Sequence, residues 1–256
     1  MKKYKLYFLR SLILLILVGI LFIAVNLFSL MFPAVEIAVA VQKKSPAHIK
    51  AIALTFDDGP HPGYTLKILR VLEKSKIKAT FFVVGKQVRK YSEFLREIAI
   101  QGHEIGNHTF NHPLLTILEP QAIADELEMN KAEIKKATGI DVAIFRPPSG
   151  RYNKKVLEAA LNRSFIPVLW SVSGSDYGAT DPKAVFLKTL SSLQDGDIIL
   201  LHSGVDATLQ ALPEIIAEIK KRGFEFKTVS GLLDTADIPA GNYIYKNYKA
   251  SIGDKR

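Results

Sequence analysis

Residues 51–60 read Ala-Ile-Ala-Leu-Thr-Phe-Asp-Asp-Gly-Pro, an apolar run that ends in two adjacent carboxylates and a Gly-Pro pair. An apolar run of this length, bounded by turn residues, is typical of a buried strand. Similar apolar runs recur along the chain, and most of them are followed by a stretch whose apolar residues repeat with helical periodicity. The stretch therefore predicts the first strand of an α/β domain.

Strand patterns alternate with amphipathic helix patterns from residue 51 onward. The expected strands are 51–56, 79–84, 103–106, 143–145, 166–171, 197–201 and 224–229. The expected helices are 64–75, 87–101, 120–137, 153–162, 182–193 and 207–221. Alternation of this kind favours a parallel sheet, either closed as a barrel or open.

Polar side chains that could carry chemistry follow the expected strands at their carboxyl ends. They are Asp57, Asp58, His108, His112, Arg146, Asp176 and His202. In a parallel β/α domain the carboxyl ends of the strands share one rim, and active sites form on that rim. We therefore expect these residues to belong to one site.

The segment His108-Thr-Phe-Asn-His112 places two imidazoles four residues apart. With one carboxylate of the pair at 57–58, they make a three-ligand set for a divalent metal with an open position. The remaining carboxylate would lie beside the metal, where a general base is needed. The chain has no cysteine, so its metal ligands must be His, Asp or Glu. These residues predict a metal-dependent hydrolase.

The N-terminal region contains a nearly continuous apolar segment at residues 12–32, preceded by basic residues and no acidic one. Twenty-one residues at helical rise span about 31 Å, close to the hydrocarbon thickness of a bilayer. We expect a transmembrane signal-anchor, with a single pass through the cell membrane and an extracytoplasmic catalytic domain. A cleavable signal peptide is the rival reading, because Ala38-Val39-Ala40 is an A-x-A pattern; cleavage after Ala40 would give a secreted protein.

Composition divides the chain into a basic tip and anchor at 1–33, a linker at 34–50, a catalytic domain at 51–236 and a tail at 237–256. Of the net charge of +9, residues 1–50 carry +6 and the tail carries +2. The basic excess therefore flanks the membrane segment or lies on the tail. It indicates contact with membrane lipid or wall, and no nucleic-acid partner.

Five ordered motifs resemble those of the polysaccharide deacetylase family, the NodB-homology domain of carbohydrate esterase family 4. They are TFDDGP (55–60), HTFNHP (108–113), RPPSG (146–150), SGSDY (173–177) and LLH (200–202). The resemblance covers about residues 51–232 and is to the membrane-anchored, bacterial cell-envelope type. It implies a distorted (β/α)7 barrel, here preceded by one N-terminal transmembrane helix.

The resemblance also implies a function. The chain would be a metal-dependent de-N-acetylase that releases acetate from N-acetylated sugars of a cell-wall glycan, with peptidoglycan as the expected substrate. Zinc is the expected metal, with cobalt or manganese as alternatives. By resemblance, Asp58, His108 and His112 would bind the metal, Asp57 would be the general base, and Arg146 would hold Asp57 in place.

The remaining motifs imply the acid and the substrate contacts. His202 would be the general acid, Asp176 would orient it, and Leu200 would help form the pocket for the acetyl methyl group. The two prolines after the motif-three arginine have no N–H, so the backbone N–H of Ser149 is the expected oxyanion donor. Tyr177 stands where the family has a tryptophan and is expected to line the substrate groove.

Departures from the family pattern leave the substrate open. Ser173 stands where the fourth motif usually has an acid, and Ser203 stands where an Asp often follows the histidine. Exopolysaccharide, chitin oligomers and acetyl xylan are therefore alternative substrates. A catalytically weak glycan-binding or scaffold domain is an alternative of another class, and a relative that cleaves a small cyclic imide is a third.

Overall fold

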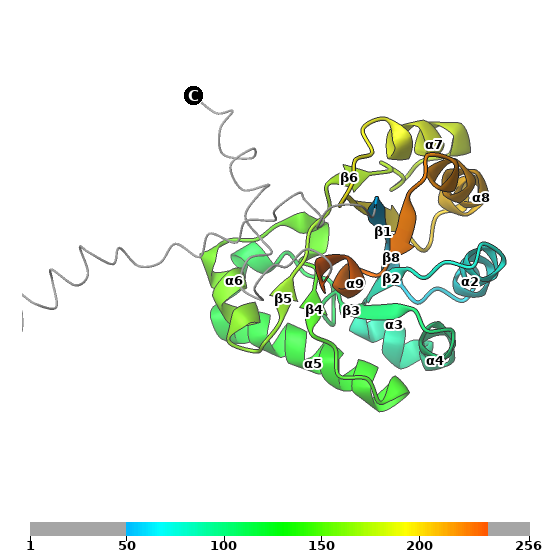
Figure 1. Ribbon diagram of the computed structural model, residues 1–256. Coiled ribbons are helices and arrows are strands. Elements are labelled where there is room, and N and C mark those ends of the chain that lie inside the picture. The colour runs from blue at the N-terminus through cyan, green and yellow to red at the C-terminus, as the bar shows by residue number, and fades with distance from the viewer. Residues whose placement is uncertain (1–49, 235–256) are drawn as a thin grey trace, which may run out of the picture. The chain divides into compact units, whose positions relative to one another are not determined.

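The computed structural model describes residues 50–234 as an α/β unit (Figure 1). The expected membrane segment at 12–32, most of the linker and the tail lie outside the described residues. Within residues 50–234, no helix is both long and apolar enough to cross a bilayer.

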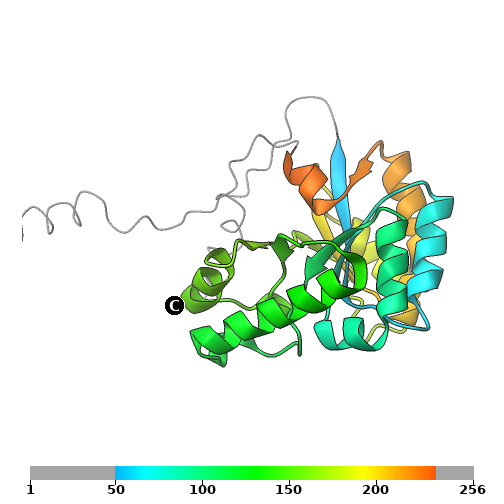
Figure 2. The same cartoon turned by 90° about the horizontal axis from the view of Figure 1, so that it is seen from below.

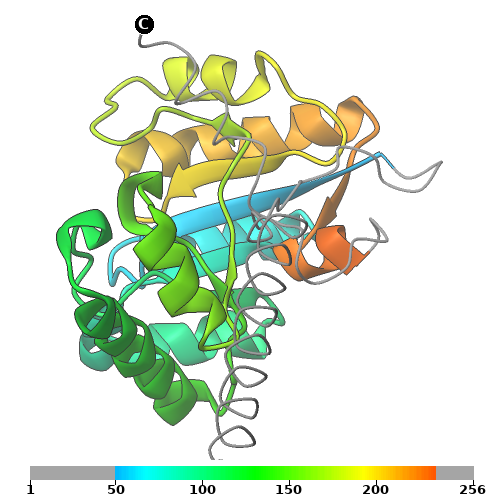
Figure 3. The ribbon, with the colours of Figure 1, turned by 90° about the vertical axis from the view of Figure 1, so that its left-hand side faces the viewer.

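The described part of the chain contains one eight-stranded sheet whose paired strands are all parallel. The strands are β1 Ala51–Gly59, β2 Thr80–Val83, β3 Glu104–Asn107, β4 Ile144–Phe145, β5 Ile166–Pro167, β6 Val172–Ser173, β7 Ile198–His202 and β8 Glu225–Lys227. Their order is β5-β4-β3-β2-β1-β7-β6, and β8 pairs with β1. The sheet curls into a half-barrel with the long β1 near its middle, as Figure 3 shows, which agrees with the α/β class that the sequence predicts.

Helices cover the outer face of the sheet, except α9, which packs on the opposite face. They are α2 Thr65–Lys74, α3 Gly85–Lys90, α4 Ser92–Ile100, α5 Pro120–Thr138, α6 Lys154–Leu161, α7 Pro182–Leu190, α8 Asp206–Lys221 and α9 Val229–Asp234. Figure 2 shows α2, α4 and α8 side by side along the strands, and each packs against its neighbour. Two 3₁₀ turns, η1 Leu115–Ile117 and η2 Pro148–Gly150, lie in the connections.

Strand β1 is buried on both faces, as expected for the centre of a parallel sheet. Ile52, Leu54 and Phe56 join the large core between sheet and helices. Ala51 and Ala53 point the other way, into a smaller cluster that α9 completes. Each large side chain buried here contributes about 1.5–3 kcal/mol to folding. The core thus fixes β1, which carries the two carboxylates at its end.

Several predicted elements differ from the observed ones. The predicted helix 87–101 is two helices, because Tyr91 leaves the helical region with φ −133° and ψ 44° while the apolar spacing continues across it. The predicted strand 166–171 is shorter in the structure, where β5 ends at Pro167 and the Val168 N–H makes the last bond to β4, to the Phe145 carbonyl. The sequence pattern missed β6 and α9 because both are too short to show a period.

Candidate active site

The sequence pattern predicted that Asp57 and Asp58 follow the first strand. In the structure both lie within β1, which continues to Gly59. In a regular strand, neighbouring side chains point to opposite faces. Here the register with β2 shifts between Asp57 and Gly59, and Asp58 has a φ of 73°. Such an irregularity re-aims a side chain at a strand end. It brings both carboxylates to the same site, Asp57 buried at 3% exposure and Asp58 partly exposed.

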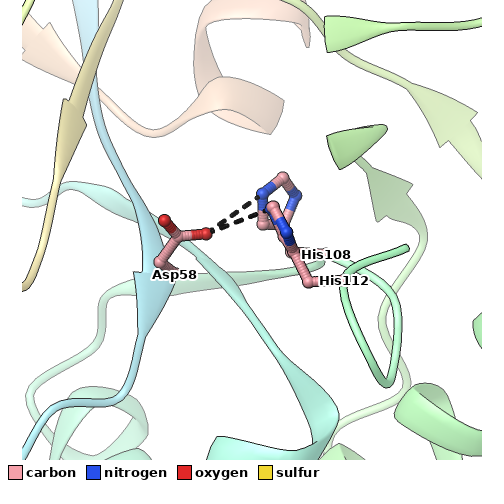
Figure 4. A group of neighbouring side chains, drawn as sticks. All are labelled: Asp58, His108 and His112. Carbon is pink, nitrogen blue, oxygen red and sulfur yellow. Dashed lines mark ion pairs between the residues drawn. The ribbon is translucent and has the colours of Figure 1, made fainter. Parts of the chain in front are cut away.

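Three donor atoms converge at this end of the sheet, as Figure 4 shows. The Asp58 Oδ1 atom lies 3.5 Å from His108 Nε2 and 3.4 Å from His112 Nε2. Donors about 2.0–2.1 Å from a tetrahedral zinc ion lie about 3.3–3.4 Å from one another. The donor chemistry and the two spacings therefore fit a divalent metal.

The His108 imidazole is held in the neutral form that metal binding requires. Its Nδ1 lies 2.8 Å from the Arg146 carbonyl oxygen, which can only accept, so Nδ1 carries the proton and Nε2 keeps its lone pair. Burial lowers the pKa of His108 to about 3, although the charge of Asp58 opposes this. A metal-binding imidazole must be neutral, and this one is neutral at neutral pH.

Asp57 is paired with Arg146 in the interior. Arg146 Nη1 donates to Asp57 Oδ1 at 2.7 Å and also contacts Thr55 Oγ1 at 2.7 Å. The guanidinium is fully buried and stacks 4.0 Å from the centre of the Phe82 ring. These contacts hold the Asp57 carboxylate next to the donor atoms of Asp58, His108 and His112, but outside that set.

Two effects compete for the charge of Asp57. Burial raises the pKa of its carboxyl above the ordinary value, and the charges of Arg146 and His202 offset only part of this. A cation at the neighbouring donor set would lower the pKa again and favour the carboxylate. The ionisation of Asp57 is therefore coupled to metal binding.

His202, the last residue of β7, is held by Asp176. Its Nδ1 lies 2.8 Å from Asp176 Oδ1, and its backbone N–H donates to Asp176 Oδ2 at 2.6 Å. Thr208 Oγ1 donates to the same Oδ2 at 2.5 Å. Asp176 is fully buried, and these three hydrogen-bond donors satisfy both of its carboxylate oxygens.

The same contacts set the protonation of the pair. Burial lowers the pKa of His202, but the hydrogen bond and charge of Asp176 outweigh it and raise the pKa above the ordinary value. Burial raises the pKa of Asp176, yet the hydrogen bond and charge of His202 outweigh it and the pKa is lowered. His202 is thereby favoured as an imidazolium that can give up a proton.

A cavity of about 670 Å³ opens over these groups. The three predicted substrate-contact residues, Ser149, Leu200 and Tyr177, all line it. Ser149 has a φ of 56° in η2, and Leu200 is 5% exposed beneath the opening. Tyr177 is 79% exposed, with its ring centre 5.4 Å from that of His202. The cavity wall also contains Trp170, which the motifs did not single out.

The structure thus brings together every site residue that the sequence singled out. Arg146 and Asp176 lie behind the cavity wall, where they support Asp57 and His202. The supporting hydroxyls of Thr55 and Thr208 were missed. Thr55 opens the first motif, but its contact with Arg146 depends on the packing of distant strands, and Thr208 lies outside all five motifs.

Comparisons with known proteins agree on one family. Residues 44–165 match the family model described as polysaccharide deacetylase. The chain is 35% identical over 193 residues to a peptidoglycan-N-acetylglucosamine deacetylase of Bacillus cereus, covering 73% of this chain and 90% of that protein. It is 36% identical over 188 residues to the peptidoglycan-N-acetylmuramic acid deacetylase PdaA of Bacillus subtilis, covering 72% of each. The structure of peptidoglycan deacetylase PdaC from Bacillus subtilis is similar with a TM-score of 0.70 and 34% identity, covering 73% of this chain and 92% of that one.

Proposed function

The chain belongs to the polysaccharide deacetylase family, and we propose that it is a metal-dependent de-N-acetylase of a cell-wall glycan, with peptidoglycan as the substrate. The observation that carries the proposal is the arrangement of a three-donor set, a separate buried carboxylate and a carboxylate-bound histidine around one cavity. The products would be acetate and a free amino sugar.

Asp58, His108 and His112 would hold the metal, with zinc favoured and cobalt or manganese possible for the same donors. When bound, the metal supplies Lewis-acid chemistry: it polarises the acetamide carbonyl and acidifies a water molecule. The neutral state of His108 and the spacing of the donors support this assignment.

Asp57 would act as the general base. Its Oδ1 accepts from Arg146, and its Oδ2 lies 3.7 Å from His108 Nε2, next to the donor set. The carboxylate would take the proton of the attacking water as the water adds to the acetamide carbon. Arg146 is a positioning residue, because it contacts Asp57 and lies outside the cavity wall.

His202 would act as the general acid. After the addition, the proton on its imidazolium would pass to the departing sugar nitrogen, and the C–N bond would break. Asp176 is the positioning residue for this step, since it fixes the ring and raises the pKa of His202.

The cavity wall supplies candidate substrate contacts. The backbone N–H of Ser149 is the proposed donor to the oxyanion, because the two residues before it are prolines. The buried side chain of Leu200 offers an apolar surface for the acetyl methyl group. Tyr177, exposed beside His202, offers a ring face to a sugar.

The proposed location follows from the sequence alone. The apolar segment at 12–32 with its basic flank would anchor the chain in the cell membrane, and the catalytic domain would lie outside the cytoplasm. Cleavage after Ala40 would release it instead. Either location would bring the domain to the wall, which favours peptidoglycan over acetyl xylan.

The experiment is acetate release by the full-length protein from peptidoglycan, chitin oligomers, poly-N-acetylglucosamine and acetyl xylan. Each substrate is tested after metal stripping and after zinc, cobalt or manganese is restored. Metal-dependent acetate from peptidoglycan above the other glycans is expected. Binding to glycan without acetate, at full metal loading, would instead indicate a glycan-binding domain.

A further inference from the structure

A buried carboxylate outside the cavity wall is bonded to the loop that carries the two histidines. Glu126 lies on α5 and is 8% exposed. Its Oε2 accepts the backbone N–H of Phe110 at 3.0 Å and that of Asn111 at 2.7 Å. Its Oε1 accepts the Asn111 side-chain amide at 2.7 Å. All three donors lie between His108 and His112.

The loop needs an acceptor at this place. Thr109 and His112 have φ values of 64° and 62°, a backbone region that residues other than glycine rarely adopt. Between these two residues, the backbone N–H groups of Phe110 and Asn111 both point toward Glu126 Oε2. Consecutive N–H groups of this kind form a concave anion-binding site. Without the carboxylate, the backbone N–H groups of Phe110 and Asn111 would lose their acceptor, which disfavours this loop conformation.

The other polar groups of the loop already have partners. The Thr109 carbonyl accepts from the backbone N–H of Gly85, and the Phe110 carbonyl accepts from that of Lys86, both at 3.0 Å. Thr109 Oγ1 accepts the His112 N–H at 3.1 Å. The start of α3 therefore holds the carbonyl side of the loop, and Glu126 holds its N–H side.

The packing leaves the loop no room to move toward the start of α3. A Cβ atom built at Gly85 would lie 2.4 Å from the Phe110 ring and 3.0 Å from its Cα. The loop is thus pressed against α3 on one side and bonded to α5 on the other. Its conformation decides where His112, at its end, lies relative to His108 at its start.

We propose that Glu126 is a positioning residue of the metal site, fixing the loop so that the His112 imidazole reaches the same ion as His108 and Asp58. The inference rests on the proposed metal-dependent function, since it assigns the metal to these three donors. Groups that hold a metal ligand in place typically change metal affinity about 10–100-fold when they are removed.

The test is metal affinity and metal spectroscopy in the full-length protein, without substrate. Zinc binding is measured by calorimetric titration, and the coordination of added cobalt by its visible absorption. Glu126→Gln keeps one acceptor oxygen and should weaken zinc binding about 10-fold; Glu126→Ala keeps none and should weaken it about 100-fold. Both variants should alter the cobalt spectrum. Glu128→Gln is the matched control, because Glu128 is exposed on the same helix.

Folding of each variant is checked by circular dichroism. If Glu126→Ala does not fold, Glu126→Gln alone decides. Wild-type zinc affinity and an unchanged cobalt spectrum in a folded Glu126 variant would overturn the inference. Failure of the proposed function looks different: the wild-type protein itself would bind no metal, or would bind metal and release no acetate.

Discussion

Asp57 of β1 and His202 of β7 are register partners in neighbouring parallel strands. Neighbouring strands lie about 4.8 Å apart, so the proposed base and acid border one site from adjacent backbones. In the proposed mechanism, Asp57 works as a carboxylate and His202 as an imidazolium. The pH profile of kcat/KM should therefore be bell-shaped, rising as Asp57 loses its proton and falling as His202 loses its own. Steady-state assays across pH check this, and a profile with only one limb would contradict the pairing.

Asp176→Asn should move chiefly the basic limb, because Asp176 acts mainly on His202 and only weakly on Asp57. Asp176 raises the pKa of His202, so a neutral amide in its place lets that pKa fall. Activity should then be lost at a lower pH, and kcat should drop by up to roughly 100-fold, part of what general acid catalysis contributes. The measurement is the pH profile of kcat/KM for the variant.

Asp181→Asn is the matched control for this change. Asp181 caps α7 by accepting the Lys183 N–H, and asparagine caps a helix equally well. Its profile should match the wild type. A basic limb that stays in place in Asp176→Asn would show that Asp176 has only a structural role.

Arg146→Lys should move the acidic limb. The three guanidinium nitrogens of Arg146 contact Asp57 and Thr55 through Nη1 and the carbonyls of Val168 and Leu169 through Nε and Nη2. The single nitrogen of a lysine cannot hold this whole arrangement, so the pKa of the buried Asp57 should rise further. The acidic limb should shift to higher pH, and kcat/KM at its maximum should fall roughly 10- to 100-fold as the carboxylate loses its position.

The exposed Arg151 offers the comparison, and Arg151→Lys should leave the profile unchanged. If Arg146→Lys lowered activity equally at every pH, Arg146 would position Asp57 without changing its protonation.

The fold was largely predictable because its signal is repetitive. Alternating strand and helix patterns, with polar residues at strand ends, predict a parallel sheet with one active rim. The strands shorter than three residues, β4, β5 and β6, were the least well defined, because the pattern needs length to show a period. The barrel implied by resemblance is seen as a curled sheet that has β5 and β6 at its ends.

The motifs indicated the residues around the cavity and two of their supports, Arg146 and Asp176, but neither the backbone geometry of the site nor the role of Glu126. The motifs mark Asp57, Asp58 and both loop histidines, but no motif reveals the irregularity in β1 that lets adjacent carboxylates share a face. Glu126 lies 14 residues beyond His112 in an ordinary amphipathic helix. Its role depends on how α5 packs, which is a property of the whole fold.

His103 should make the protein less stable in acid. It is buried, its Nδ1 accepts the Ala79 N–H at 3.2 Å, and burial with the charge of Lys78 lowers its pKa from 6.5 to about 4. The unfolded chain binds the proton more readily, so the free energy of unfolding falls as pH drops from about 6.5 towards about 4, by up to roughly 3 kcal/mol.

His103→Asn removes this titration and keeps an acceptor for the Ala79 N–H. Urea denaturation at about pH 7 and about pH 4.5 measures the loss for each protein. The variant should lose less stability than the wild type between these conditions. Equal losses would mean that His103 does not titrate differently on folding.

His112→Ala should weaken zinc binding by more than roughly 100-fold, since removing a group that only supports a ligand already costs 10–100-fold. Calorimetric titration measures the affinity. His61→Ala provides the comparison, because His61 lines the same cavity but is outside the donor set. Equal weakening in both variants would mean that the donor set is assigned wrongly.

The measurement that tests the central claim most directly is acetate release by Asp57→Asn at full metal loading. The amide keeps the size of the side chain and cannot act as a base, while Asp58, His108 and His112 stay in place. Metal content equal to the wild type, with turnover on peptidoglycan reduced by roughly 10²–10⁴-fold, is the expected result. Wild-type turnover in the metal-loaded variant would contradict the assignment of Asp57 as the base and the mechanism built on it.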